Sequence, residues 1–147
     1  MSGAHFAGAW LRYDAQKVIF VGDSVVLNQP TFFAKADLTT WIEDLEWLGS
    51  DRFKNFKIIS GRNGLIQSSS IRTMSALLNE AKERIDELAE EEMPLVNVPE
   101  LAAHLLKKIN YDSQLRDRYY LRLTRGLEQY IRRHMINSET DTKGEIE

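Results

Sequence analysis

The alternation of hydrophobic and polar residues divides the chain into a front part rich in strands and a helical back part. Residues 9–13 and 17–21 are short β-prone runs, separated by a length suited to a hairpin turn. The run Val18–Val21 is apolar on both faces, which is typical of a buried central strand. A further strand is predicted at Phe56–Ser60, before the turn Gly61–Gly64.

Helical spacing of apolar residues follows in four segments. Asp37 stands where the N-cap of a first helix is expected, and Gly49 ends that helix. A long helix begins at Ser68–Ser70, a third begins near Pro99, and a fourth spans residues 112–136. The resulting order, β-β-α-β-α-α-α, predicts an α/β fold with a sheet covered by helices.

The amino-acid composition argues against several classes of function for this chain. The chain has 147 residues, the size of one domain, and its formal charge of −3 gives no basic field for nucleic acid or an anionic membrane. No apolar run approaches the roughly 20 residues that cross a bilayer, and no signal-peptide pattern is present, so a cytoplasmic protein is expected. Cysteine is absent, so metal ligands must be histidine or carboxylate.

Three segments at the ends of predicted strands could carry chemistry, because open α/β sheets place their sites there. They contain His5, Asp23 and the turn Gly61–Gly64. Each also has a plainer interpretation when taken singly. A turn aspartate often bonds its own backbone, a histidine near a terminus often lies on the surface, and glycines flanking a turn often supply positive φ.

Taken in order, four segments resemble the second half of the metallo-β-lactamase-fold hydrolases. They are the turn Gly3–Gly8, the strand and turn Lys17–Asp23, the helix after Asp37 with Trp41 and Leu45, and the strand and turn Ile58–Gly64. The resemblance covers roughly residues 3 to 90. It implies half of a metallo-β-lactamase-like αββα sandwich, with a short mixed sheet covered by helices and a C-terminal helical extension.

The corresponding division of the chain has three parts. Residues 1–92 form the half-domain and residues 93–137 form the helical extension. Residues 138–147 hold almost no apolar mass and are expected to be a disordered tail.

The resemblance also implies roles for individual residues. His5 would be a metal ligand, and Asp23 would be the carboxylate that bridges two zinc or iron ions. Arg62 stands where the family has its last histidine, and a guanidinium has no free lone pair for a metal. Asn63 offers only an amide oxygen, so this pair is interpreted as a degenerate ligand position that could bind an anion. The family's His-x-His-x-Asp-His motif has no counterpart upstream of His5.

Two donors are fewer than the three or so that a catalytic zinc needs. The leading hypothesis is therefore a truncated hydrolase-like protein that either binds no metal and is inactive alone or needs a partner chain. With a completed site it would hydrolyse an ester, a thioester or a phosphodiester, and whether the chain is an enzyme stays open. The alternative is a non-enzymatic oligomerisation or interaction module on the same scaffold.

A missing half would leave one sheet face uncovered. The face near Trp10, Ile19 and Val21 is expected to be exposed, which soluble monomers rarely tolerate over a large area. This predicts a homo-oligomer or a partner chain that covers the face, and no membrane association.

A nucleic-acid-binding domain is the least favoured alternative. The nucleic-acid-binding surface would be one face of the last helix, with Arg118, Arg122, Arg125 and Arg132. An acidic face on the earlier long helix could match these arginines, so they are expected to serve packing. His104 and His134 lie outside any family pattern and are expected to be surface or cap residues.

Overall fold

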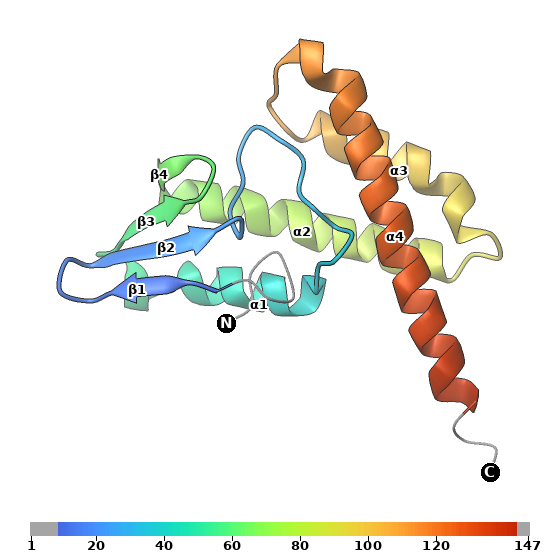
Figure 1. Cartoon of the computed structure of the whole chain (residues 1–147), viewed down its shortest axis with the longest axis horizontal. Coiled ribbons are helices and arrows are strands. Elements are labelled where there is room, and N and C mark those ends of the chain that lie inside the picture. Colours follow the sequence, from blue (N-terminus) through green and yellow to red (C-terminus); the bar gives the residue numbers. More distant parts are fainter. Residues whose placement is uncertain (1–8, 144–147) are drawn as a thin grey trace.

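The computed structural model describes residues 9–143, with side chains as far as Met135. The described residues contain a four-stranded sheet and four α-helices (Figure 1). These elements are β1 (Leu11–Tyr13), β2 (Val18–Gly22), α1 (Leu38–Leu48), β3 (Lys57–Ser60), β4 (Gly64–Ile66), α2 (Ser68–Ala89), α3 (Val98–Lys107) and α4 (Arg116–Lys143). The predicted α/β class is therefore confirmed.

The sheet is mixed and has the order β1-β2-β3-β4. β1 and β2 form an antiparallel hairpin, β2 and β3 are parallel, and β4 returns antiparallel to β3. Helix α1 makes the crossover between the two parallel strands, as a parallel connection requires. The carboxyl ends of β2 and β3 consequently lie at one edge of the sheet.

One face of the sheet packs against α1 and α2. Ile19 and Val21 from β2 are buried, with 0% and 1% of their surface exposed, and so is Trp41 of α1. Trp10 is half-buried and stacks on Trp47. The prediction that the face near Ile19 and Val21 is exposed is therefore wrong, because these side chains point toward the helices and not away from them.

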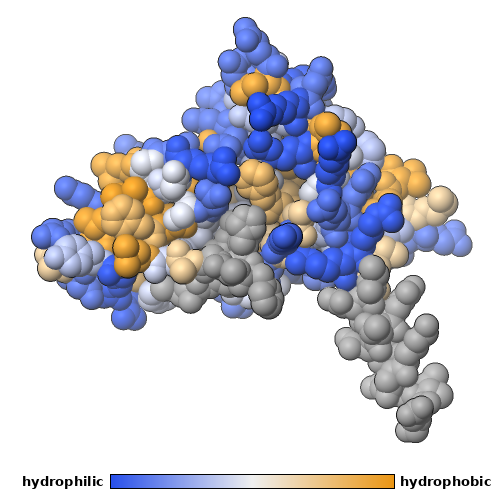
Figure 2. Space-filling view, viewed as in Figure 1, coloured by the Kyte–Doolittle hydropathy of each residue, from blue (hydrophilic) through white to orange (hydrophobic). Residues whose placement is uncertain are grey.

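The opposite face is the open one. Leu11, Phe20 and Leu65 are 67%, 43% and 67% exposed. Leu11 lies opposite Phe20, Phe20 opposite Ile59, and Ile59 opposite Leu65, so each strand contributes one apolar side chain to a single row across the sheet. Figure 2 shows hydrophobic residues gathered over the strands on this side of the molecule. We call these four residues the apolar row.

Helix α4 packs on α3 and on the segment between β2 and α1. Leu123 and Leu127 of α4 share one hydrophobic core with Phe33 of that segment. At Gly126 the helix passes close to the segment, because a Cβ there would lie 3.5 Å from the backbone nitrogen of Phe33. The C-terminal helices therefore belong to the same core as the sheet.

The structure differs most clearly from the sequence prediction at two elements, β4 and α4. Strand β4 was not predicted, since its three residues follow a turn and precede a helix cap. Helix α4 continues past residue 136 to Lys143, into the segment for which a tail was expected; residues 144–147 lie outside the described part. None of the helices within residues 9–143 has the length and apolarity needed to cross a membrane.

Candidate functional site

Asp23 and Arg62 meet at the edge where the parallel strands end. Asp23 follows β2 and Arg62 follows β3, which brings residues 39 positions apart into contact. Arg62 Nε donates to Asp23 Oδ1 at 3.1 Å, and Nη2 donates to Oδ2 at 3.4 Å. This two-point contact is the geometry in which a guanidinium recognises a carboxylate most specifically.

Two glycines allow the turns that carry these residues to approach each other. Gly61 N donates to Gly22 O at 2.8 Å, and a Cβ on Gly61 would lie 3.3 Å from the carbonyl carbon of Gly22. Gly22 itself has a φ of +54°, in the left-handed region that favours glycine. The strand ends therefore turn sharply and place Asp23 and Arg62 side by side.

Ser60 and Asn63 anchor the segment that follows Asp23. The Ser60 hydroxyl donates to Val25 O at 2.7 Å, and the Asn63 amide oxygen accepts from Leu27 N at 2.9 Å. The Asn63 amide nitrogen donates to Leu27 O at 3.2 Å. Both ends of the Asn63 amide are thus engaged by backbone, which gives this predicted site residue a role in holding the loop.

Two indoles hold Ser24, the residue after Asp23. Trp41 Nε1 of α1 donates to Ser24 O at 2.9 Å, and Trp10 Nε1 donates to Ser24 Oγ at 2.7 Å. Ser24 is 1% exposed, so these are bonds in the interior. Buried polar groups of this kind are costly to leave unpaired, and their pairing fixes the direction in which the chain leaves β2.

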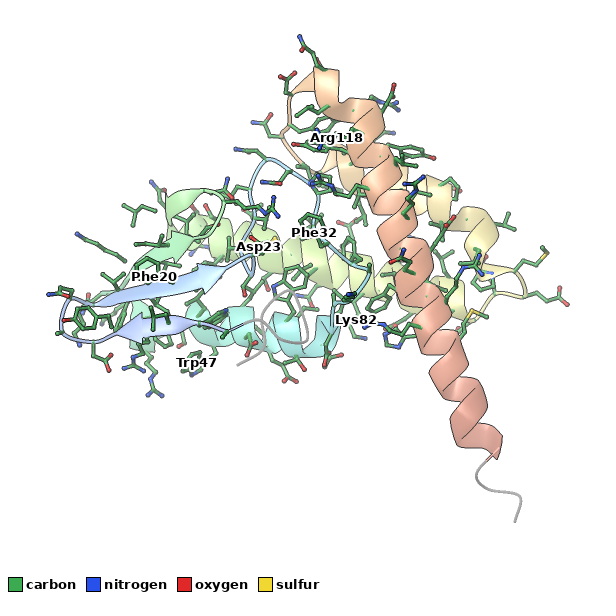
Figure 3. The ribbon with its side chains drawn as sticks, viewed as in Figure 1. Phe20, Asp23, Phe32, Trp47, Lys82 and Arg118 are labelled. Carbon is green, nitrogen blue, oxygen red and sulfur yellow. The ribbon has the colours of Figure 1, made fainter. Side chains whose placement is uncertain are left out.

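An aromatic ring connects the Asp23–Arg62 pair to helix α4. The guanidinium carbon of Arg62 lies 5.0 Å from the centre of the Phe32 ring, and that of Arg122 lies 4.9 Å from it. Figure 3 shows Phe32 between Asp23 and α4. Guanidinium groups at this distance are attracted by the ring electrons. Sequence reasoning missed Phe32, because an aromatic residue in a loop carries no pattern of its own.

The described residues alone do not form a site for a hydrolytic metal. The described residues contain no group of three or more histidine, cysteine, aspartate or glutamate side chains that could hold a metal ion. Both oxygens of Asp23 accept from Arg62, and the guanidinium places positive charge where the resemblance expects a metal-bound imidazole. His5 lies outside the described residues.

The other histidines have ordinary structural partners. His104 Nε2 lies 2.6 Å from Glu80 Oε1, and this hydrogen bond is the main reason why the pKa of Glu80 is lowered. The His134 ring lies against Tyr130, with the ring centres 4.3 Å apart and the planes tilted by 42°, and burial lowers the pKa of His134. Neither histidine contacts the Asp23–Arg62 pair.

Comparison with protein-family models, with curated proteins and with solved structures finds no match for this chain. A function must therefore be argued from the geometry. Three structural features are the basis for that argument: the Asp23–Arg62 pair at the sheet edge, the apolar row on the open face, and the arginines of α4 around Phe32.

Proposed function

We propose that the chain is the carboxyl-terminal half of a metallo-β-lactamase-like sandwich, a hydrolase-derived module that functions by pairing its open sheet face with a second sheet. The observation that carries the proposal is the one-sided sheet. Helices cover the face of Ile19 and Val21, while the apolar row faces outward. Each half of a two-sheet sandwich has this arrangement, with helices outside and apolar side chains toward the other sheet.

The position of Asp23 and Arg62 supports the same proposal. In the resemblance these are the bridging carboxylate and the place of the last ligand, two positions that must come together for the comparison to hold. They lie on neighbouring parallel strands and touch.

The donor set supports a module that is silent by itself. The guanidinium of Arg62 places a positive charge against Asp23, and the Asn63 amide oxygen already accepts from Leu27 N, so both groups are weakened as ligands for a metal cation. Hydrolysis of an ester, a thioester or a phosphodiester would require donors from another polypeptide segment. Without them the module is an interaction domain on a hydrolase scaffold.

Two measurements on the purified chain test the proposal. Elemental analysis is expected to find zinc and iron far below one per chain, with no hydrolysis of p-nitrophenyl acetate or bis-p-nitrophenyl phosphate above background. One tightly bound metal per chain together with hydrolysis would overturn the silent module.

Light scattering after size exclusion tests the open face. Self-association through the apolar row is expected, and the variant Phe20→Asp with Leu65→Asp is expected to be monomeric. Substituting Thr39→Asp and Gln114→Asp, which adds the same two negative charges at exposed positions outside the sheet, is the control. A wild-type chain that is monomeric at all concentrations, or a double variant that associates equally well, would contradict the role of this face.

A further inference from the structure

We infer that a groove between α4 and the segment before α1 binds a small organic phosphate, and that Arg118, Arg122 and Arg125 supply its positive charge. The groove has a volume of about 340 Å³. The three arginines line it together with apolar residues, which are Phe32, Phe33, Ala34, Leu121 and Gly126. A groove with concentrated positive charge and apolar walls suits a ligand with an anionic head and an apolar body.

The arginines of this groove lack internal counter-charges. Within residues 9–135 no ion pair joins Arg118, Arg122 or Arg125 to a carboxylate. The acidic side chains of α2 that were expected to match them are engaged elsewhere, since Asp86 pairs with Lys82 and Glu87 with Arg84. The expectation that α2 neutralises the arginine face is therefore wrong for the described residues.

Arg122 is held in place before any ligand arrives. Its guanidinium lies 4.9 Å from the Phe32 ring centre and 5.3 Å from that of Tyr119. Its Nη1 is buried and has no acceptor among the described residues. A positioned guanidinium with an unused donor loses little freedom when it binds, so an anionic oxygen beside it gains a charge-assisted hydrogen bond.

A larger groove provides a contrast. It has a volume of about 600 Å³ and lies between residues 26–29 and α2. Its charged residues Glu80 and Lys108 pair with each other at 3.6 Å. The charges of that groove are therefore matched, whereas the three arginines of the arginine groove form no ion pair with a carboxylate of residues 9–135.

The observations favour a small phosphate over nucleic acid. The whole chain is acidic, with a net charge of −3, so a long polyanion would be repelled outside the groove. Arg133, which could extend the basic face, donates to Ala36 O and packs on Tyr130. The inference does not depend on the sheet pairing proposed above, because the residues that line the groove belong to α4 and to the segment before α1.

Calorimetric titration with pyrophosphate and with adenosine monophosphate tests the inference. We expect both to bind, more weakly as salt is raised, and Arg122→Gln or Arg125→Gln to weaken binding by about tenfold to a hundredfold. Arg72→Gln on α2 removes the same charge outside the groove and is expected to leave affinity unchanged. Amide chemical shifts should move at Phe33, Ala34 and Gly126.

Three results would overturn it. The first is no binding of either probe by a folded chain. The second is an equal loss in Arg72→Gln and Arg122→Gln, which would indicate a general charge effect. The third is binding that requires a single-stranded oligouridylate of about eight nucleotides, a typical site size for such strands, because that outcome would assign the groove to nucleic acid.

Discussion

Arg62 contacts Asp23 through the two nitrogens of one guanidinium edge, Nε and Nη2, with nitrogen–oxygen distances of 3.1 Å and 3.4 Å. The two side chains remain 40% and 28% exposed, so solvent screens the pair and its contribution to stability is small. Its consequence is chemical, because the guanidinium neutralises the carboxylate that the resemblance assigns to metal binding. The arginine therefore disfavours a cation at the position that the resemblance assigns to a metal.

Replacing Arg62 by histidine should therefore raise the affinity of the chain for Zn²⁺. In Arg62→His the imidazole and the Asp23 carboxylate would lie at the ends of adjacent parallel strands, where both can reach one ion. We expect Zn²⁺ to bind at least about tenfold more tightly than to the wild-type chain, measured by competition with a chromogenic chelator.

Two controls make this result specific. Arg62→Gln removes the guanidinium without adding an imidazole and should gain less affinity than Arg62→His. Asp23→Asn combined with Arg62→His should lose the gain. If Arg62→His binds Zn²⁺ no better than the wild-type chain, positions 23 and 62 do not form a ligand pair.

Asn63 should matter more for stability than either member of the ion pair. Asn63→Ala leaves the backbone N–H and C=O of Leu27 without their partners, which costs about 1–2 kcal/mol in unfolding free energy. Arg62→Gln should cost less than about 1 kcal/mol, because its contacts are half exposed. Urea unfolding followed by tryptophan fluorescence compares them, and a larger loss in Arg62→Gln would contradict the assigned roles.

Periodic features of the sequence predicted much of the fold. The apolar spacing in residues 38–48 and 68–89 marks two amphipathic helices, and Asp37 is the cap that its position indicated, accepting from Thr40 N. Such features repeat along the chain and are set by local geometry. They could therefore be predicted from the sequence without knowledge of the tertiary structure.

Features that depend on a single tertiary contact could not be predicted from the sequence. The contact between Arg62 and Phe32 joins residues with no shared pattern, and so does that between Arg122 and Phe32. The outward face of β2 was also assigned with the wrong parity, because Val18–Val21 is apolar at every position and alternation gives no signal. Only the packing of the folded chain, which buries Ile19 and Val21 and leaves Phe20 43% exposed, shows that Phe20 faces outward.

Substitutions at two neighbouring residues of β2 should change the free energy of unfolding by very different amounts. Ile19→Ala removes a fully buried side chain and should cost about 2–4 kcal/mol, whereas Phe20→Thr on the open face should change stability by less than about 1 kcal/mol. Chemical unfolding at low protein concentration separates this effect from association. Equal losses at the two positions would indicate that the open face is covered within the chain.

Asp37 should make part of the stability depend on pH. Its carboxylate caps α1 by accepting from Thr40 N at 3.1 Å and from Thr40 Oγ1 at 2.8 Å, and the backbone bond is the main reason why the pKa of Asp37 is lowered. Because the pKa is lower in the folded state, the stabilisation is fully present above the unfolded value and is lost as pH falls through the folded one. Asp37→Ala should therefore cost about 1 kcal/mol at neutral pH and less in acid. Unfolding curves between roughly pH 7 and pH 2 measure the difference.

Asp37→Asn, which keeps a neutral cap, is the control. The stability advantage of asparagine over alanine at this position should not vary with pH. A cost of Asp37→Ala that stays constant on acidification would show that the carboxylate charge contributes nothing to stability.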